Sequence, residues 1–579
     1  MLKKNDIVTI RIDDISKDGE GIGKADGFAL FVKDTVPGDL IEASVMKVKK
    51  RYGYARLLRV LEPSTDRTEP ACPVARQCGG CRLQMMTYEK QLQLKQHIVI
   101  NTLEHIGGFT VVPKEKADFP EKTLKTVPMQ PIVPVDPVFR YRNKAVIPVG
   151  TNKDGKPVAG FFAGHTHAII PCDDCLLGPE ENGSIIRCIL YWMVKQNIPA
   201  YNEADGTGLI RHIFLRKSRE SGRFQLCLIV NGKKVPGVQS LREALDRLHA
   251  KGEDGASFTV SEPLICGACF SANTRRTNVI FGDAPVTLWG DPILEDSLYS
   301  DRFGITVRYR ISPMSFYQVN PNIAEKMYEE VLALADLTGR ETVFDLYCGT
   351  GTISLFLAKK AKEVIGVEIV PEAVANAMEN ARLNGCSNAR FLEGKAEEVI
   401  PELIRKENLH ADVVVVDPPR KGCAGSLLRT IIDMNPDKIV YVSCDPATLA
   451  RDLKILCAEQ YRIESVRPYD QFAMSMHVET VVSLGRKKEE IEYAYLPYEG
   501  SKDLRMPIKV SYLEIKDWVK QKYGFNVTSL MVAQTKRKHG LIERENYNKP
   551  KDEGRGAYPC PKDKEAAIED AFRYFGMIS

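Results

Sequence analysis

The sequence lacks any uninterrupted apolar run long enough to span a bilayer, and it does not begin with basic residues followed by an apolar stretch. We therefore expect a cytoplasmic protein without a membrane segment. It also lacks a strong excess of either charge, because 80 Lys and Arg against 76 Asp and Glu leave a formal net charge of +4. Any contact with nucleic acid must then come from local basic patches. A chain of 579 residues is too long for one hydrophobic core, so roughly two to four domains are expected.

The chain has 15 cysteines, and those that lie closest together lack a spacing typical of a zinc ribbon. In a chain that looks cytosolic, so many thiols indicate metal binding or catalysis rather than disulfides. Cys72, Cys78 and Cys81 lie in one loop, with two glycines between the second and the third, so the backbone can wrap closely around a metal cluster. Cys172 and Cys175 are two candidates for a fourth ligand. Zinc is the competing occupant, but the C-x5-C-x2-C spacing favours an iron–sulfur cluster.

The first sixty residues alternate short apolar runs with glycine-rich turns, which predicts a small β-barrel. Residues 47–56, at its end, interleave basic and aromatic side chains that suit phosphates and stacked bases. The run Phe139–Lys144 has a similar composition and could contact RNA. An exposed strand edge has the same pattern, so neither segment identifies a binding site by itself.

Between these two segments and beyond them the pattern changes several times. Residues 88–105 are apolar at helical spacing and precede Gly107 and Gly108, which predicts a helix with a glycine stop. Residues 107–137 show little periodicity and predict a surface connection. From residue 139 to about residue 300, short apolar runs and turns predict a mainly β domain.

After residue 305, strands and helices alternate in the rhythm of a doubly wound sheet. Residues 342–352 predict a strand that enters a glycine turn, but the turn is not G-x-G-x-x-G and has no P-loop lysine, which disfavours dinucleotides and ATP. The next strand ends at Glu368, an acid suited to ribose hydroxyls, and residues 413–416 run into a rigid Asp-Pro-Pro loop at Asp417. Together these features predict a methyltransferase that uses S-adenosylmethionine (SAM).

One further strand carries the candidate nucleophile. Residues 439–443 are apolar and β-branched, which predicts a buried strand of a parallel sheet. The pattern breaks at Asp445-Pro446, so Cys444 lies where the strand enters a loop, at the edge where open α/β sheets bind ligands. A lone cysteine is more often a small buried hydrophobe, and only the surrounding motifs favour chemistry here.

The motifs that carry a family resemblance are the three cysteines of the first loop, Ser315–Asn320, Asp345–Gly351, Asp417–Arg420, Ser443–Pro446 and His477–Thr480. With them, the sequence resembles the RNA uracil-5-methyltransferases from residue 1 to about residue 487. The resemblance is strongest to the bacterial ribosomal RNA branch, which has an N-terminal TRAM barrel and an iron–sulfur cluster.

This resemblance implies that Cys444 is the nucleophile and Glu479 the base in a covalent methylation of uracil at C5. Because the thiolate is the reactive form, we expect Cys444 to have a lowered pKa. The resemblance also implies a SAM pocket lined by Gln318, Tyr347, Glu368 and Asp417. The implied [4Fe-4S] ligands are Cys72, Cys78, Cys81 and Cys175, with Cys175 preferred to Cys172 because an apolar pair, Leu176-Leu177, follows it.

The same resemblance divides the chain into four expected parts: a TRAM-like (OB-like) barrel (1–60), a central RNA-binding and iron–sulfur domain (61–86 and 130–305), a Rossmann-like α/β methyltransferase domain (87–129 and 306–487) and a helical extension (488–579). The expected substrate is a uridine of 23S ribosomal RNA in a loop or flipped out, bound by a monomer. A transfer RNA uracil-5-methyltransferase and a non-catalytic iron–sulfur RNA-binding protein are the alternatives. A DNA cytosine-5-methyltransferase is disfavoured, because that class carries its nucleophile in a Pro-Cys dipeptide whereas Ser443 precedes Cys444.

The resemblance ends before the last ninety residues. Apolar spacing predicts an amphipathic helix over residues 512–523, stopped at Gly524, and a second helix over residues 528–539 that ends in the basic cluster Lys536–His539. This arrangement resembles a helix-turn-helix unit. An added RNA-binding module is the hypothesis, and a protein-docking appendage is the alternative.

Overall fold

The computed structural model describes residues 2–114, 125–164, 166–248, 263–458, 460–487, 512–539, 541, 560–575 and 577–578. The chain divides into two compact units, Met1–Arg486 and Lys487–Ser579. None of the described helices is long and apolar enough to cross a membrane.

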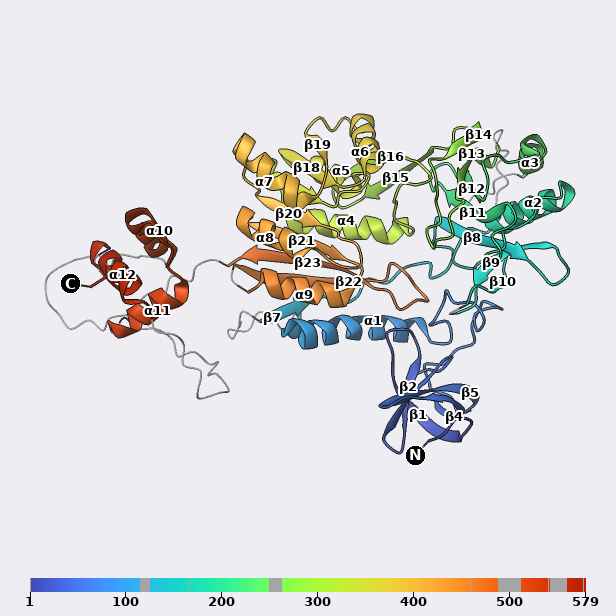
Figure 1. The fold of residues 1–579 in the computed structure, drawn as a ribbon, viewed down its shortest axis with the longest axis horizontal. Helices are drawn as coiled ribbons and strands as arrows, with labels where there is room; N and C mark the ends of the chain where they lie inside the picture. The colour runs from blue at the N-terminus through green and yellow to red at the C-terminus, as the bar shows by residue number, and fades with distance from the viewer. Residues whose placement is uncertain are drawn as a thin grey trace. The chain divides into compact units, whose positions relative to one another are not determined.

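Five N-terminal strands form a closed barrel in the order β1-β2-β3-β5-β4 (Figure 1), which confirms the predicted small barrel. The strands are β1 (Ile7–Ile15), β2 (Gly21–Ala25), β3 (Phe28–Val32), β4 (Leu40–Val48) and β5 (Tyr52–Glu62). Alternate side chains such as Ile10 and Leu30 fill the barrel. The rings of Phe31, Tyr52 and Tyr54 lie with centroids between 5.4 and 5.8 Å apart, and Lys49 lies over Tyr52. A cationic and aromatic group is thus present on the barrel, as residues 47–56 suggest.

A long helix follows, α1 (Tyr88–Thr102), which continues as a turn of π-helix, η1 (Leu103–Gly107). It ends at Gly108, whose φ of 72° lies in the left-handed region, so the predicted helix and glycine stop are confirmed. The chain then forms two short strands, β6 (Thr110–Pro113) and β7 (Thr126–Met129), at the end of a large sheet. The expected surface connection was wrong here, because Val127 and Met129 are buried in the sheet's core and tertiary packing outweighs a weak local pattern.

The middle of the chain forms a seven-stranded sheet in the order β10-β9-β8-β11-β12-β13-β14. The expectation of a mainly β domain was incomplete, because α2 (Glu181–Lys195) and α3 (Val238–Leu245) pack against this sheet. Ile185, Ile189 and Trp192 of α2 share one core with the strands, since an apolar sheet face needs a covering layer. The strands are β8 (Lys144–Thr151), β9 (Pro157–Phe162), β10 (Ile169–Pro171), β11 (Ile210–Lys217), β12 (Phe224–Val230), β13 (Ile265–Ala272) and β14 (Val286–Gly290).

After a hairpin of β15 (Leu294–Ser300) and β16 (Ile305–Ile311), the chain builds most of a nine-stranded sheet. Its order is β19-β18-β17-β20-β21-β23-β22-β7-β6, and β19 to β21 run parallel, as the doubly wound pattern predicts. The remaining strands are β17 (Thr342–Leu346), β18 (Glu363–Glu368), β19 (Ala389–Glu393), β20 (Val413–Val416), β21 (Lys438–Ser443), β22 (Tyr461–Tyr469) and β23 (Glu479–Arg486).

Helices cover both faces of this sheet (Figure 1). Successive strand residues enter opposite cores: Val343 lies in one and Phe344 in the other. One core includes residues of α4 (Pro321–Ala335), α5 (Thr352–Ala358) and α6 (Pro371–Leu383). The other includes residues of α1 and of α7 (Ala396–Glu407), α8 (Gly425–Met434) and α9 (Pro446–Leu456). Because both faces are covered, the ends of the strands are the natural place for a site.

The second unit contains α10 (Tyr512–Tyr523), α11 (Ser529–Lys538) and α12 (Lys562–Tyr574). The first two occupy the segments in which the sequence predicts helices, whereas α12 was not predicted. The three share a small core in which Ile515, Val519, Val532 and Phe572 are fully buried. Lys538 and His539 of the basic cluster contact Glu569 of α12. Both side chains therefore form ion pairs within the helical unit.

Candidate active site

The candidate site lies where four parallel strands end at one edge of the large sheet. Strand β17 ends at Leu346, β18 at Glu368, β20 at Val416 and β21 at Ser443. The strand order changes direction between β17 and β20, because β18 and β19 lie on one side and β21 on the other. A crevice for a ligand forms outside such a switch point in open α/β sheets. The sequence-predicted Glu368, Asp417 and Cys444 all lie at this edge.

The antiparallel pairing of β21 with β23 brings Cys444 next to Glu479. Ser443 pairs with Thr480 at the end of the ladder, so the two residues that follow in opposite directions are Cys444 and Glu479. The thiol is partly exposed, whereas Glu479 is only 5% exposed. Burial and the nearby carboxyl of Asp417 raise the pKa of Glu479 to about 8, against the opposing effect of Arg420. The two residues thirty-five positions apart therefore share one environment.

The pKa of Cys444 is raised to about 12, so the expectation of a lowered pKa was wrong. Burial is the largest cause, and the charges of Glu479 and Asp417 raise the pKa further. Arg420 lowers it, but one exposed guanidinium does not outweigh burial and two carboxyl groups. In this environment the thiol form of Cys444 dominates at neutral pH.

The loop that carries Cys444 is fixed by the first turn of α9. Asp445 is the N-cap residue, and its side chain accepts hydrogen bonds from the backbone N–H groups of Ala447 (2.9 Å) and Thr448 (3.0 Å). Pro446 occupies the first helical turn, where its missing N–H costs nothing. The Thr448 hydroxyl also donates to the carbonyl of Arg420 at 3.2 Å, which ties this loop to the Asp-Pro-Pro loop.

The glycine turn after β17 meets the acid at the end of β18. The N–H of Gly349 donates to the Glu368 carboxylate at 3.1 Å. Gly349 and Gly351 have φ values of 56° and 80°, a left-handed conformation that glycine adopts without strain. A Cβ at position 349 would meet open space, whereas one at position 351 would lie 3.0 Å from the ring of Phe391. The turn thus leaves room on one side for a ligand and packs tightly on the other.

Three carboxyl groups gather at the same edge of the sheet. The pKa of Asp417 is raised to about 7 by burial and by Asp345, and that of Asp345 is raised to about 7 by burial, with Glu368 adding to the shift. Asp345 accepts a hydrogen bond from Ser354 through one oxygen, while its buried Oδ1 has no partner among the described residues. These mutual effects place Asp345, Glu368 and Asp417 close together.

Gln318 is another residue that the family resemblance assigns to the SAM pocket. Its Oε1 accepts a hydrogen bond from Nε2 of Gln471 at 2.9 Å, and Gln471 Oε1 is buried without a partner among the described residues. The carbonyl of Gln471 also accepts a bond from the Asn320 side chain at 3.2 Å. The orphaned oxygens of Asp345 and Gln471 are acceptors that the amino and hydroxyl groups of SAM could satisfy, so the residues present fit this methyl donor.

The structure does not bring Tyr347 together with these acids in the same way. Tyr347 is half-buried and has a φ of 71°, and burial, Cys423 and Glu397 raise its pKa to about 12. Its ring packs against the core that contains α8. The Asp345–Gly351 motif predicted the turn correctly. Its contact with SAM remains a prediction.

The three thiols of the cysteine loop lie near those of Cys172 and Cys175. Burial raises the pKa of Cys81 to about 12, with further contributions from Cys175, Cys78 and Cys72. Burial likewise raises the pKa of Cys172 to about 12, with contributions from Cys175 and Cys72. Among the described residues, no group of three or more His, Cys, Asp or Glu side chains has an arrangement that could hold a metal ion. The donor set of thiols suits an iron–sulfur cluster chemically.

Sequence reasoning missed two residues of the candidate site, Arg420 and Gln471. Arg420 lowers the pKa of both Cys444 and Glu479 and lies 3.3 Å from Nε2 of His477. Arg420 is the last residue of the Asp417–Arg420 motif. The sequence therefore shows its charge but does not show that it affects the pKa values of Cys444 and Glu479. Gln471 comes from the segment before β23, and only tertiary structure shows that it reaches Gln318.

The α/β fold and the site at its strand ends are typical of a methyltransferase, and comparison with known proteins identifies the family. Residues 2–58 match the family model of the TRAM domain, and residues 294–487 match that of tRNA (Uracil-5-)-methyltransferase. The described barrel lies in the first segment and the candidate site in the second. The chain is thus an RNA methyltransferase that carries a TRAM domain.

Relatives along most of the chain agree. An uncharacterized RNA methyltransferase of Halalkalibacterium halodurans is 43% identical over 486 residues, which are 84% of this chain and 98% of that protein. An uncharacterized RNA methyltransferase of Clostridium acetobutylicum is 44% identical over 486 residues, again 84% of this chain and 98% of that protein. The solved structure of Pyrococcus abyssi tRNA (uracil-54, C5)-methyltransferase with S-adenosyl-L-homocysteine has a TM-score of 0.61 and 25% identity, covering 82% of this chain and 100% of that one. The chain belongs to the family of SAM-dependent RNA (uracil-5-)-methyltransferases.

Proposed function

We propose that this protein methylates C5 of a specific uridine in 23S ribosomal RNA, through a covalent bond between Cys444 and C6 of uracil. The observation that carries this proposal is the pairing of Ser443 with Thr480, which sets Cys444 beside Glu479 at the edge that also holds Asp417. A nucleophile, a base and a crevice for the methyl donor are all needed for this chemistry, and they meet at one place.

The proposed roles follow from the reactivity of uracil. C5 is too weak a nucleophile to take a methyl group directly, and addition of the Cys444 thiolate to C6 moves the ring's π electrons to O4 and makes C5 nucleophilic. SAM, when bound, supplies the methyl group that C5 attacks. C5 then carries a proton and a methyl group, and Glu479 removes the proton. The electron pair re-forms the C5–C6 double bond, and Cys444 Sγ leaves C6.

The SAM pocket is proposed to use Gln318, Glu368 and Asp417, joined by Tyr347 from the family motif. One carboxylate oxygen of Glu368 accepts a hydrogen bond from the N–H of Gly349, and the other accepts one from the N–H of Val370 at 3.0 Å. The position of Glu368 is therefore fixed before SAM binds. Gln318 is held by Gln471 in the same way. Preorganised acceptors of this kind lower the cost of ordering the site.

Ribosomal RNA is proposed as the substrate because the chain combines the barrel with the cysteine loop. Transfer RNA is the alternative, and the likeness to the Pyrococcus abyssi enzyme, whose printed name gives a tRNA substrate, favours it. The two can be separated by incubating the enzyme and labelled SAM with 23S ribosomal RNA and with bulk tRNA from cells that lack this gene. Labelled 5-methyluridine in the ribosomal RNA alone would support the proposal, and label in the tRNA alone would replace it.

A [4Fe-4S] cluster on Cys72, Cys78, Cys81 and Cys175 is part of the proposal, as a structural rather than a chemical element, because the methylation needs no electron. The thiol of Cys81 is influenced by those of Cys175, Cys78 and Cys72, which supports Cys175 as the fourth ligand that the family resemblance implies. Anaerobic purification followed by iron and sulfide analysis tests it. We expect Cys81→Ser to lose iron and the control Cys266→Ser, on β13, to retain it. An iron-free wild-type protein would exclude the cluster.

The expected four-part division is proposed for the parts that the structure describes: the barrel, the central sheet, the nine-stranded sheet with α1, and the helical unit. The barrel and the central sheet are proposed to hold RNA as a monomer, so that a uridine in a loop or flipped out of its stack reaches the crevice.

A further inference from the structure

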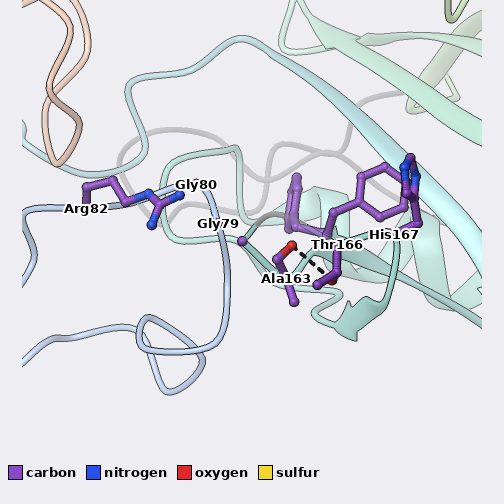
Figure 2. A pocket seen from close by; sticks show the side chains of 9 residues that line it. Gly79, Gly80, Arg82, Ala163, Thr166 and His167 are labelled. Carbon is purple, nitrogen blue, oxygen red and sulfur yellow. Dashed lines mark hydrogen bonds between the residues drawn. The ribbon is translucent and has the colours of Figure 1, made fainter. Parts of the chain in front are cut away.

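A pocket of about 460 Å³ lies between the cysteine loop and the turn after β9, away from the residues of the candidate active site. Figure 2 shows Arg82 on one side of this pocket and His167 on the other, with Gly79 and Gly80 between them. Its volume lies within the range of small-ligand sites, about 300–1,000 Å³. The rest of its lining is Phe161, Phe162, Ala163, Gly164 and Thr166.

The two walls of the pocket are held together by backbone pairing. The N–H of Gly79 donates to the carbonyl of Phe162 at 3.0 Å, and Cys78 and Ala163 form an isolated antiparallel bridge. A Cβ at position 79 would lie 3.1 Å from that carbonyl oxygen, so glycine permits this close approach. The pocket is therefore a fixed part of the fold and not a gap between loose loops.

The chemistry of the lining suits one nucleotide. The guanidinium of Arg82 makes no hydrogen bond or ion pair with any residue that the structure describes, so its charge is available to a phosphate. Across the pocket, the rings of Phe162 and His167 meet edge to face with centroids 5.6 Å apart, and His167 is held by Glu203 at 2.7 Å. An aromatic surface opposite a free cation is the arrangement that binds unpaired bases and their phosphates.

The backbone of Arg82 is also hydrogen-bonded to the segment that leads to Glu479. Its backbone N–H donates to the carbonyl of Met474 at 2.8 Å, five residues before Glu479. A Cβ on Gly19, in the barrel turn between β1 and β2, would lie 2.8 Å from Arg82 Cβ and 3.4 Å from Met476 Cγ. The barrel, the cysteine loop and the segment leading to Glu479 thus meet at Arg82.

We infer that this pocket binds a nucleotide of the substrate RNA that flanks the target uridine, with its phosphate against Arg82 and its base against Phe162 and His167. The inference rests on the proposed function and adds to it a site that selects the surroundings of the uridine. Removing a residue that binds RNA without touching the reacting atoms should raise KM for RNA and leave kcat unchanged.

The test compares Arg82→Gln with Arg76→Gln, a matched control on the same loop whose side chain is 65% exposed and pairs loosely with Glu69 at 3.9 Å. With 23S ribosomal RNA transcribed in vitro, we expect Arg82→Gln to raise KM for RNA about tenfold, with kcat and KM for SAM unchanged. The slope of log affinity against log salt should become shallower by about one unit in a filter-binding assay. The control should match the wild type in each measurement.

Other outcomes are decisive as well. An unchanged KM and salt slope for Arg82→Gln would overturn the inference, as would equal losses in both variants, or a fall in kcat alone with a lowered unfolding temperature. Binding is measured separately from turnover, so a wild-type protein that binds this RNA without methylating it would contradict the proposed function but leave the pocket testable by its salt slope. A second variant, His167→Ala, should weaken binding without changing that slope, since it removes a ring and not the phosphate contact.

Discussion

Cys444 and Glu479 lie side by side because Ser443 of β21 pairs with Thr480 of β23 in the antiparallel part of an otherwise parallel sheet. The carboxyl group of Glu479 raises the pKa of the thiol, and Asp417 raises the pKa of both. The proposed base therefore makes it harder to ionise the proposed nucleophile.

This coupling predicts that methyl transfer speeds up as the pH rises. The pKa of Glu479 is raised to about 8, so its carboxyl is neutral and cannot act as a base well below that pH. The pKa of Cys444 is raised to about 12, so the reactive thiolate fraction grows throughout the same range. We expect the single-turnover rate to increase between about pH 6.5 and pH 9. A rate that is flat or falling over this range would show that the active form is already present at low pH.

A buried ion pair holds the segment before Glu479, and breaking it should destabilise the protein. Lys95 of α1 contacts Asp470 at 2.5 Å with both side chains 0% exposed, and Asp470 also accepts from the hydroxyl of Tyr88 at 2.8 Å. Lys95→Met leaves a buried carboxylate unpaired, which costs about 3–5 kcal/mol. We expect a clearly lower unfolding temperature by differential scanning calorimetry.

The double variant Lys95→Met/Asp470→Asn is the control for that measurement. Removing both charges should recover part of the lost stability, because no unpaired charge stays buried. A single variant as stable as the wild type, or a double variant less stable than the sum of the two single changes, would show that the pair does not hold this segment.

The second unit is predicted to contribute little to RNA affinity through its basic cluster. Lys538 pairs with Glu565 at 2.9 Å, His539 with Glu569 at 2.8 Å, and Lys536 lies over the ring of Tyr512. Because these cations have partners in their own module, we expect deletion of residues 487–579 to leave the slope of log affinity against log salt unchanged. A slope shallower by two or more units would instead establish the module as the RNA-binding unit that its helix-turn-helix pattern suggests.

The sequence predicts the barrel and the doubly wound sheet well, because alternating apolar residues and β-branched runs such as residues 413–416 leave few other structures. It also places Glu368, Asp417 and Cys444 at strand ends, where a parallel sheet must bring them to one edge. The short strands β6 and β7 were missed, since four residues carry too little pattern and gain their stability from Val127 and Met129 in a distant core.

The pKa values of the site residues could not be predicted from the sequence. The pKa of Cys444 depends on Glu479, Asp417 and Arg420, which come from separate segments, and on how deeply each group is buried. No spacing in the chain gives the sum of these opposing effects. The same holds for Gln471, whose contact with Gln318 joins residues 153 positions apart.

The most direct test of the account is to incubate Glu479→Gln with SAM and 23S ribosomal RNA, and to look for a protein–RNA adduct on a denaturing gel. Without the base, proton removal from C5 stops and Cys444 stays bonded to C6, so we predict a slow band that is absent from the double variant Cys444→Ala/Glu479→Gln. Cys444→Ala alone should transfer no methyl group. Normal turnover by Cys444→Ala would contradict the covalent mechanism.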